Sequence, residues 1–285
     1  MTRRDFFYSL VGITAVLFAR TDKLLSQEET LSSTAKIFSE IITHACRQKW
    51  HSMDISDLIS RIAVSFVDTP YVAGTLDRNE VEEAVVNLEE LDCVTFVENS
   101  LCIARCIKKQ HFRFSDLVDE VIYTRYRDGN IGDYTTRLHY TSEWIINNIK
   151  KGVVEDITES LGGTKHKFNI NFMSNNIEFY PALQNNKQYI QKIKNIEEFL
   201  SEQTFFVIYK RNIKSVMKKL RDGDIILIAT SAKGLDYSHI GLLFNRKMLH
   251  ASSKHKKVLI DKSLDVYIRG NKKAIGITVL RPIAL

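Results

Sequence analysis

A cysteine stands where the sequence predicts the start of a helix. Cys93 follows Asp92, and an aspartate just before a helix is a good N-cap. The unpaired N–H groups and the positive dipole end of such a helix stabilise a thiolate. The thiolate is the form of cysteine that attacks carbonyl carbons, and the same N–H groups can hold the resulting oxyanion. Cys93 is therefore a candidate nucleophile, although a buried cysteine is usually inert.

Two histidines far along the chain could assist that cysteine. His239 begins one apolar run and His250 lies in the next, with Asn245–Lys247 between them suited to a hairpin turn. The two histidines could then be cross-strand neighbours on one face of a sheet. Cys93, His239 and His250 would supply a nucleophile, a general base and a group that orients the base. Either histidine alone would more often be structural or exposed.

The elements expected to position these residues begin with helices. Apolar residues recur at helical spacing from about residue 31 to residue 67, and a further helix is expected from Cys93 to about Lys108. Between them, Thr69–Gly74 breaks the periodicity and is expected to be a loop. Two polar segments that combine arginine with aromatic residues are also expected to be helical: Arg125–Gly129 and Arg137–Trp144.

Strands are expected in the last third of the chain. Short runs rich in Ile, Val, Leu and Phe follow one another from residue 204, separated by Gly, Asn, Lys and Asp, which predicts an antiparallel sheet. These runs are Phe205–Tyr209, Ile225–Ala229, His239–Phe244, Met248–Ala251, Val258–Ile260 and Ile275–Leu280. Helices first and strands later favour an α+β fold over an alternating α/β fold.

Composition excludes several classes of protein. The 285 residues are 44% hydrophobic and 26% charged, with 12 Gly and 3 Pro, which excludes a disordered or collagen-like chain. The net charge of +6 is compatible with anionic partners such as nucleic acid, anionic lipid or cell-wall polymer. The basic clusters Lys218–Arg221 and Lys254–Lys257 have no interleaved aromatic residues, so no nucleic-acid partner is predicted.

The four cysteines suggest neither a disulfide framework nor a metal site. They are too few to staple a chain of this length. Cys102 and Cys106 are four residues apart on the predicted helix and are expected to be buried thiols on one face. A zinc site that used them with Cys93 and His111 is disfavoured, because a helix would place Cys93 and His111 about five turns apart. We expect no metal and no cofactor.

The first residues have the pattern of an export signal. Arg3 and Arg4 precede an uncharged stretch from Phe6 to Ala19, which is too short for a comfortable membrane span. The string from Thr2 to Phe7 resembles a twin-arginine signal. We expect residues 1–26 to be a signal peptide or a retained N-terminal anchor, and the protein to be exported to the periplasm with no membrane span in its mature form.

Several short motifs in one order resemble the NlpC/P60 cell-wall hydrolases. The match comprises a tyrosine loop with glycine, an Asp-Cys pair, a His-Ile-Gly strand and a His-Ala-Ser strand. Val94-Thr95 replaces the usual Ser-Gly after the cysteine, and a long segment separates Cys93 from His239. Both departures resemble one branch, formerly called domain of unknown function 1460, an N-acetylmuramoyl-L-alanine amidase-like group. The segments similar to that branch are Leu91–Glu98, Arg125–Gly129, Arg137–Trp144, Phe172–Ser174, Gly234–Gly241 and His250–Ser253.

The resemblance implies a papain-like core in which the Cys93 helix packs on the C-terminal sheet. It implies one catalytic domain over residues 27–285, with a large, mostly helical insertion at about 112–193 that builds the substrate cleft. Cys93 would be the nucleophile, His239 the base and then the acid, and His250 the orienting residue. The candidates for binding substrate are Tyr71, Asp92, Arg137, His139, Tyr140, Trp144 and Ser238. Within this set Asp92 is expected chiefly to cap its helix.

The activity implied is hydrolysis of the amide between N-acetylmuramic acid and L-alanine in peptidoglycan fragments, by a monomer. Two alternatives remain open. One is an endopeptidase that cuts the stem peptide after D-glutamate, and the other is an inactive cell-wall-binding domain that keeps a relic triad.

Overall fold

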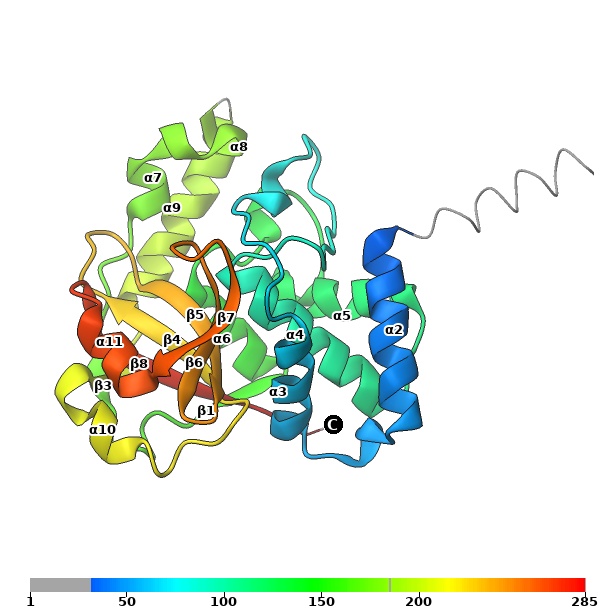
Figure 1. Ribbon diagram of the computed structural model, residues 1–285. Coiled ribbons are helices and arrows are strands. Elements are labelled where there is room, and N and C mark those ends of the chain that lie inside the picture. Colours follow the sequence, from blue (N-terminus) through cyan, green and yellow to red (C-terminus); the bar gives the residue numbers. More distant parts are fainter. Residues whose placement is uncertain (1–31, 185, 285) are drawn as a thin grey trace, which may run out of the picture.

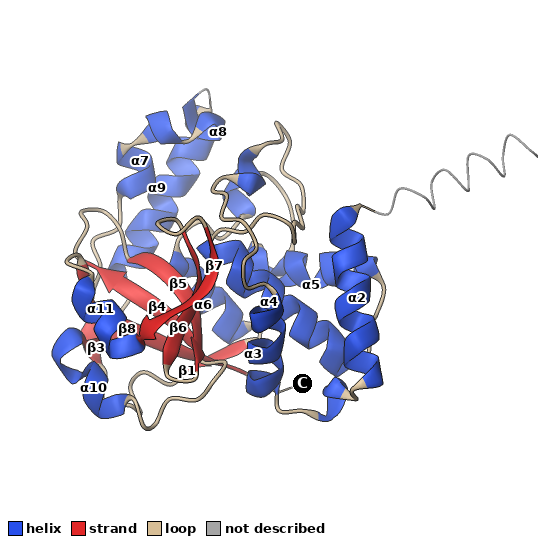
Figure 2. Ribbon diagram, in the orientation of Figure 1, coloured by secondary structure: helices blue, strands red, loops and turns tan. Residues whose placement is uncertain are grey.

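The computed structural model describes residues 32–184 and 186–284 and confirms a mixed α+β fold (Figure 1). The predicted signal peptide or anchor at residues 1–26 lies outside the described residues. Figure 2 shows the strands gathered into one sheet, with α2 to α5 grouped beside it and α7 to α9 beyond one end. Within the described residues, no helix is long and apolar enough to cross a bilayer.

Helices predominate in residues 32–150, as predicted. Of the described helices, the first two, α2 and α3, begin at side-chain N-caps: Ser32 accepts from the N–H of Ala35, and Asp54 accepts from the N–H of Ser56. These helices and α5 surround α4, whose residues from Thr95 to Ile107 are all buried. The bounds are α2 Ser33–Arg47, α3 Ile55–Ser65, α4 Cys93–Lys109, α5 Phe114–Arg125 and α6 Thr141–Lys150.

The sheet has eight antiparallel strands, in the order β2-β3-β8-β4-β5-β6-β7, with β1 also paired to β8. All six predicted runs lie within its strands. Its bounds are β1 Val154–Asp156, β2 Thr164–His166, β3 Phe205–Tyr209, β4 Ile225–Thr230, β5 Tyr237–Phe244, β6 Lys247–Ser252, β7 Lys257–Ser263 and β8 Ala274–Pro282. The central strand β4 is buried throughout, which explains why its sequence is a continuous apolar run.

The segment predicted as an insertion carries α5 and α6, two short strands and three further helices. Strands β1 and β2 were not predicted; each is three residues long, with no apolar run to mark it. They pair with β8 and β3, so this segment extends the sheet as well as covering it. The further helices are α7 Phe172–Asn175, α8 Pro181–Gln184 and α9 Lys187–Glu202; two more, α10 Ile213–Val216 and α11 Leu264–Gly270, lie outside it.

Both segments that combine arginine with aromatic residues depart from the predicted helix. In the first, α5 ends at Arg125, Tyr126 lies in a β-bridge, and Arg127–Gly129 is a short 3-10 helix in which Asp128 has a φ of 52°. The second is wrong in its first half. Residues Arg137 to Tyr140 are not helical, and α6 begins only at Thr141. Arg137 instead forms an antiparallel bridge with Tyr126, and the N–H of Leu138 donates to the carbonyl of Arg125. These contacts between segments satisfy the backbone groups that a helix would have paired, and periodicity alone does not reveal them.

Candidate active site

The capping box at the start of α4 fixes the position of Cys93. Asp92 Oδ1 accepts hydrogen bonds from the N–H groups of Val94 (3.0 Å) and Thr95 (2.8 Å). In return, Thr95 Oγ1 accepts one from the N–H of Asp92 (2.9 Å). Cys93 is thus the first residue of a 17-residue helix that packs on β5 and β6. The predicted helix start is confirmed to the residue, and Asp92 is its N-cap.

The hairpin of β5 and β6 brings the two histidines together on one face. Asn245 and Arg246 have φ values of 49° and 60°, the left-handed pair that a tight two-residue hairpin needs. Leu242 pairs with Leu249, so His239 and His250 are diagonal neighbours. His239 Nε2 lies 2.7 Å from His250 Nδ1. Gly241 permits this arrangement, because a Cβ there would lie 2.9 Å from the Cβ of His250.

Cys93 and His239 line one cavity of about 220 Å³. Its walls come from four places: the start of α4, the segment before α6, the region of α7 and α8, and the start of β5. Five of the sequence-predicted residues meet there, namely Cys93, His139, Tyr140, Ser238 and His239. The other lining residues are Val94, Thr141, Met173, Tyr180, Leu235, Asp236, Tyr237 and Ile240.

The structure corrects the expectation that the helix start stabilises a thiolate on Cys93. Burial, reinforced by the Asp92 carboxylate, raises the pKa of Cys93 to about 12. Hydrogen bonds from the backbone N–H groups of Ile240, Cys93 and Val94 only partly offset that effect. Burial and the neighbouring His250 also lower the pKa of His239 to about 3. Both shifts favour the uncharged forms, a thiol on Cys93 and a neutral imidazole on His239.

Two residues that the sequence analysis missed, Asp261 and Tyr267, lie close to His250. Its side chain is almost wholly buried, and its Nε2 lies 3.6 Å from Oδ2 of Asp261 on β7. The ring of Tyr267 on α11 lies against both histidines, with centroid distances of 5.0 Å to His250 and 6.3 Å to His239. His250 pairs with Leu259, so two-residue alternation places Asp261 on the same face. The alternation of side chains along β7 could therefore have identified Asp261 from the sequence.

Tyr71, near the cavity, and His139, in its wall, have defined surroundings. Tyr71 is half-buried, and the pKa of its hydroxyl is raised to about 12. Burial is the largest cause, and negative charge on Cys93 and on Asp92 adds to it. Tyr71 therefore lies close to Cys93. His139 Nε2 lies 2.7 Å from the carbonyl oxygen of Tyr134. Burial and then Arg137 lower the pKa of His139 to about 3, so this ring is also neutral.

Tyr140 lines the cavity, and its hydroxyl is already hydrogen-bonded within the protein. The hydroxyl donates to Glu197 Oε1 (2.7 Å) and accepts from the N–H of Met173 (2.9 Å), so it ties the helices beyond the sheet to this wall. Asp236, a buried lining residue that the sequence analysis did not single out, performs a similar task. Its Oδ2 accepts from both the N–H and the hydroxyl of Ser142, each at 2.7 Å, and so joins the start of β5 to the start of α6.

Arg137 and Trp144 do not join this cavity. The Arg137 side chain is 7% exposed and is already paired with Asp77 and Glu82, so its charge is not free to clamp a substrate carboxylate. Trp144 is 4% exposed and donates from Nε1 to Glu98 Oε1 (3.0 Å), which places it in the core. A stacking role on a sugar does not fit such burial.

The remaining thiols show no arrangement for a metal. Cys102 and Cys106 are buried, with Cys102 Sγ 3.2 Å from Thr124 Oγ1, and Cys46 is exposed. Across residues 32–184 and 186–284, no group of three or more His, Cys, Asp or Glu side chains is placed to hold a metal ion.

Comparison with known proteins identifies the family. A family model described as AmiA-like, N-acetylmuramoyl-L-alanine amidase-like, matches residues 61–277. The solved structure of an N-acetylmuramoyl-L-alanine amidase from Bacteroides uniformis is 34% identical, with a TM-score of 0.77 over 80% of this chain and 99% of that chain. None of the curated proteins matches.

Two other solved structures are also similar. A putative xylanase from Bacteroides fragilis is 36% identical, with a TM-score of 0.74 over 78% of this chain and 99% of that one. A Legionella pneumophila protein of the domain of unknown function 1460 family is 21% identical, with a TM-score of 0.64 over 90% and 95%, and shows the fold alone. Since the family model spans most of the sequence, this chain belongs to the N-acetylmuramoyl-L-alanine amidase-like family.

Proposed function

We propose that the protein is a thiol hydrolase of the NlpC/P60 type with a papain-like core. One observation carries the proposal: a cysteine at a helix start shares a cavity with His239, whose ring is held by His250. The packing of α4 on β5 and β6 is what such a core requires. A nucleophile, a base and a group that orients the base are the parts needed for acyl transfer.

The proposed substrate is a peptidoglycan fragment, and the bond cut is the amide between N-acetylmuramic acid and L-alanine. The support is the family match and the Bacteroides uniformis relative, which is named for that activity. One catalytic domain, residues 27–285, would act as a monomer without a cofactor.

The proposed chemistry starts from the neutral pair. His239 takes the Cys93 proton as the sulfur attacks the lactyl carbonyl carbon, and N–H groups at the start of α4 stabilise the oxyanion beside Tyr71. His239 then gives that proton to the departing amine of L-alanine, which leaves a thioester on Cys93. Water, deprotonated by His239, hydrolyses the thioester and restores the thiol. His250 keeps the His239 ring in position throughout.

Mass spectrometry of defined muropeptides, with Cys93→Ala alongside, tests the proposal. Release of free sugar and an intact peptide that begins with L-alanine, by the wild type alone, is the expected result. Sugar-L-Ala-D-Glu as the product would identify a stem-peptide endopeptidase instead. If neither protein cleaves any muropeptide while both bind peptidoglycan, the binding-domain alternative holds.

Export is also part of the proposal. The twin-arginine-like string at Thr2–Phe7 supports transport to the periplasm. Cell fractionation of the full chain and of a variant with Arg3→Lys and Arg4→Lys tests it. We expect periplasmic protein only for the first; equal export of both would exclude the twin-arginine route.

A further inference from the structure

The net positive charge of the protein comes from one short segment. Residues 210–221 hold six Lys and Arg residues and no Asp or Glu. The whole chain has 40 basic and 34 acidic residues, so the two signs balance outside this segment. Charge concentrated in this way produces a local field that a balanced surface lacks. The segment is therefore a candidate for contact with an anionic partner.

The fold turns the basic side chains of this segment outward. The chain leaves β3, forms a short 3-10 helix at Lys210–Asn212 and then α10, and returns to β4. Ile213, Val216 and Leu220 are buried in the apolar cluster beneath α10 and α11. Since these apolar residues face the sheet, the residues on the other side of the turn face solvent. The exposed basic residues, which we call the basic face, are Arg211, Lys214, Lys218, Lys219 and Arg221.

The basic face is not neutralised by acidic side chains. Across residues 32–184 and 186–284, none of its five members forms an ion pair, whereas Lys192 and Lys257 each pair with an aspartate. Asp265, on the neighbouring α11, already pairs with Arg269. The positive charges of the basic face therefore repel one another in the free protein, and an anionic surface would relieve that repulsion.

A second basic turn lies beside the basic face. Lys210 Nζ donates to the carbonyl oxygen of Asn271, so the turn between α11 and β8 lies against the start of the segment. That turn adds Lys272 and Lys273, which are both exposed. Figure 1 shows α10 and α11 on the far side of the sheet from α2. The positive charge thus extends over two neighbouring parts of one side of the molecule.

The basic face and the catalytic cavity lie at opposite ends of β5. The loop after α10 meets the far end of this strand, where the N–H of Asn245 donates to Asp222 Oδ1 (2.8 Å). His239 lies near the start of the same strand, about 20 Å away at the rise of an extended chain. Contact at the basic face would therefore leave the catalytic cavity uncovered.

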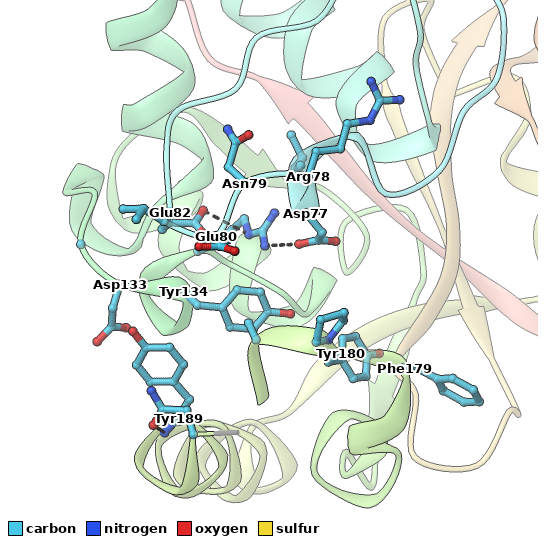
Figure 3. Close-up of a pocket in the computed structure, with 17 residues that line it drawn as sticks. Asp77, Arg78, Asn79, Glu80, Glu82, Asp133, Tyr134, Phe179, Tyr180 and Tyr189 are labelled. Carbon is cyan, nitrogen blue, oxygen red and sulfur yellow. Dashed lines mark hydrogen bonds and ion pairs between the residues drawn. The ribbon is translucent and has the colours of Figure 1, made fainter. Parts of the chain in front are cut away.

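Acidic groups gather near the catalytic cavity instead. Figure 3 shows Asp77, Glu80 and Glu82 at a larger cavity of about 820 Å³, which shares Tyr180 with the catalytic one. Four carboxylates and two guanidinium groups line this larger cavity. An anionic surface would repel such a lining and attract the basic face. Charge therefore favours one orientation of the protein on an anionic surface.

The chemistry of the basic face suits the headgroups of an anionic lipid bilayer. Its exposed residues include no aromatic side chain on which nucleic-acid bases would stack. Its apolar residues are buried, so the contact would be electrostatic and would not insert into the bilayer. The sequence points independently to a membrane, because the uncharged stretch from Phe6 to Ala19 is predicted to be a signal peptide or an anchor.

We propose that residues 210–221 form a docking surface for anionic phospholipid membranes, which holds the protein at the bilayer with its catalytic cavity directed away. The inference does not depend on the proposed amidase activity, because it rests on charge and orientation. If both proposals hold, the enzyme acts at the membrane surface on substrate that approaches from the solvent side.

Co-sedimentation of the full chain with lipid vesicles tests the proposal. Vesicles of phosphatidylcholine alone are compared with vesicles that contain an equal part of phosphatidylglycerol. We expect the triple variant Lys214→Gln, Lys218→Gln and Lys219→Gln to bind the anionic vesicles roughly 100-fold more weakly than the wild type. The reason is that each lysine near such a surface strengthens binding about five-fold. Binding to phosphatidylcholine alone should not change, because those vesicles have no net charge.

The matched control removes the same number of charges from other parts of the surface. Lys187 and Lys194 on α9 and Lys254 in the β6–β7 turn are all exposed. We expect their joint replacement by Gln to weaken binding to the anionic vesicles less than five-fold. If it weakened binding as much as the first triple variant, net charge would explain the binding and the docking surface would be wrong. Equal binding of the wild type to both kinds of vesicle would also overturn the proposal.

Salt and nucleic acid provide two further readouts. Raising the salt concentration from about 0.1 M to about 1 M shortens the screening length from about 10 Å to about 3 Å. The preference of the wild type for anionic over neutral vesicles should then disappear, and a preference that survived would contradict electrostatic docking. If duplex DNA bound more tightly than the anionic vesicles, and the first triple variant lost that binding, the segment would be a nucleic-acid surface instead.

Muropeptide cleavage by the same variants separates this proposal from the proposed function. Both triple variants should keep the turnover of the wild type, with circular dichroism to show that they are folded. If lipid binding follows the expected pattern while the wild type cleaves no muropeptide, the docking surface stands and the amidase proposal fails. If the wild type releases free sugar but does not prefer anionic vesicles, the amidase proposal stands and the docking surface is wrong.

Discussion

At the scale of single residues, burial keeps Cys93 and His239 uncharged in the free protein. The pKa of Cys93 is raised to about 12 and that of His239 is lowered to about 3, so neither a thiolate nor an imidazolium is present at neutral pH. In the proposed mechanism, proton transfer then accompanies attack on the carbonyl carbon instead of preceding it.

The first prediction concerns the acid limb of the pH–rate profile. Only neutral His239 can accept the Cys93 proton, and lowering its pKa keeps it neutral as the pH falls. We therefore expect kcat/KM to be lost with a midpoint well below the ordinary histidine pKa of 6.5. A pH–rate profile measures this, with circular dichroism at each pH to show that the protein stays folded. A midpoint at or above 6.5 would contradict the buried, neutral base.

The second prediction concerns Asp261 as a positioning residue. Its carboxylate faces His250 Nε2, which favours the tautomer with the proton on Nε2 and leaves Nδ1 to accept from His239. His239 Nδ1 is then free to accept the Cys93 proton. We expect Asp261→Asn to lower kcat roughly ten-fold with little change in KM, about 1.4 kcal/mol of transition-state stabilisation.

The pH profile distinguishes this role from a structural one. Loss of the Asp261 carboxylate removes a negative charge that favours a protonated histidine pair. We therefore expect the acid limb of the pH–rate profile to move to still lower pH. Asp265→Asn, the same change four residues along the chain at a side chain paired with Arg269, is the control and should leave the profile unchanged. If the acid limb of Asp261→Asn were unchanged, the role of Asp261 would be structural only, and the positioning role would be wrong.

At the scale of elements, α4 carries Cys93, the proposed nucleophile, at its first position. Its capping box satisfies N–H groups at the helix start and fixes the first turn. We expect Asp92→Ala to cost about 1 kcal/mol of stability and to lower kcat/KM as well, because Cys93 sits in the turn that frays. Chemical denaturation and steady-state kinetics measure the two effects.

Asp54→Ala provides the matched control for the cap. Asp54 caps α3 in the same way, through a hydrogen bond from the N–H of Ser56 (2.8 Å), but α3 carries no residue of the proposed triad. A similar loss of stability with unchanged kcat/KM is expected. If both variants lost activity equally, the effect of Asp92 would be global stability and not placement of Cys93.

Elements with strong local patterns could be predicted from the sequence, and those made by distant pairing could not. The start of α4 was predicted because Asp92 is a local cap, and the strands from β3 onward because each is an apolar run. Strands β1 and β2 exist only through pairing with β8 and β3. The prediction of a helix at Arg137 to Tyr140 was wrong, because the residues that pair with this segment lie elsewhere in the chain.

The same distinction applies to the candidate site. Cys93, His239 and His250 could be proposed because each stands in a short recognisable motif, and the hairpin sets their register. Asp261 and Tyr267 are near His250 only through the β6–β7 pairing and the packing of α11. Trp144 was predicted to bind substrate because its residue type suits stacking on a sugar. The sequence did not reveal that its side chain is buried.

At the scale of the whole molecule, a buried charge network links the helices near Cys93. Glu98 on α4 accepts from Arg125 Nε on α5 (2.8 Å) and from Trp144 Nε1 on α6 (3.0 Å). Arg125 also donates from Nη1 to the carbonyl of Val85 in the loop that leads to Cys93. A buried pair of this kind stabilises little by itself, but removal of one partner is costly. The network therefore ties α5, α6 and that loop to the helix that carries Cys93.

Trp144→Phe tests whether that network is structural. The change keeps an aromatic ring but leaves Glu98 Oε1 without its indole donor, so we expect about 2 kcal/mol less stability in urea denaturation. The KM for muropeptide should not change, because Trp144 is 4% exposed and lines neither cavity. Trp50→Phe makes the same change of ring beside Arg61, away from Glu98, and should cost less. If Trp144→Phe instead raised KM without loss of stability, Trp144 would contact the substrate. That contact would require α6 to move when substrate binds.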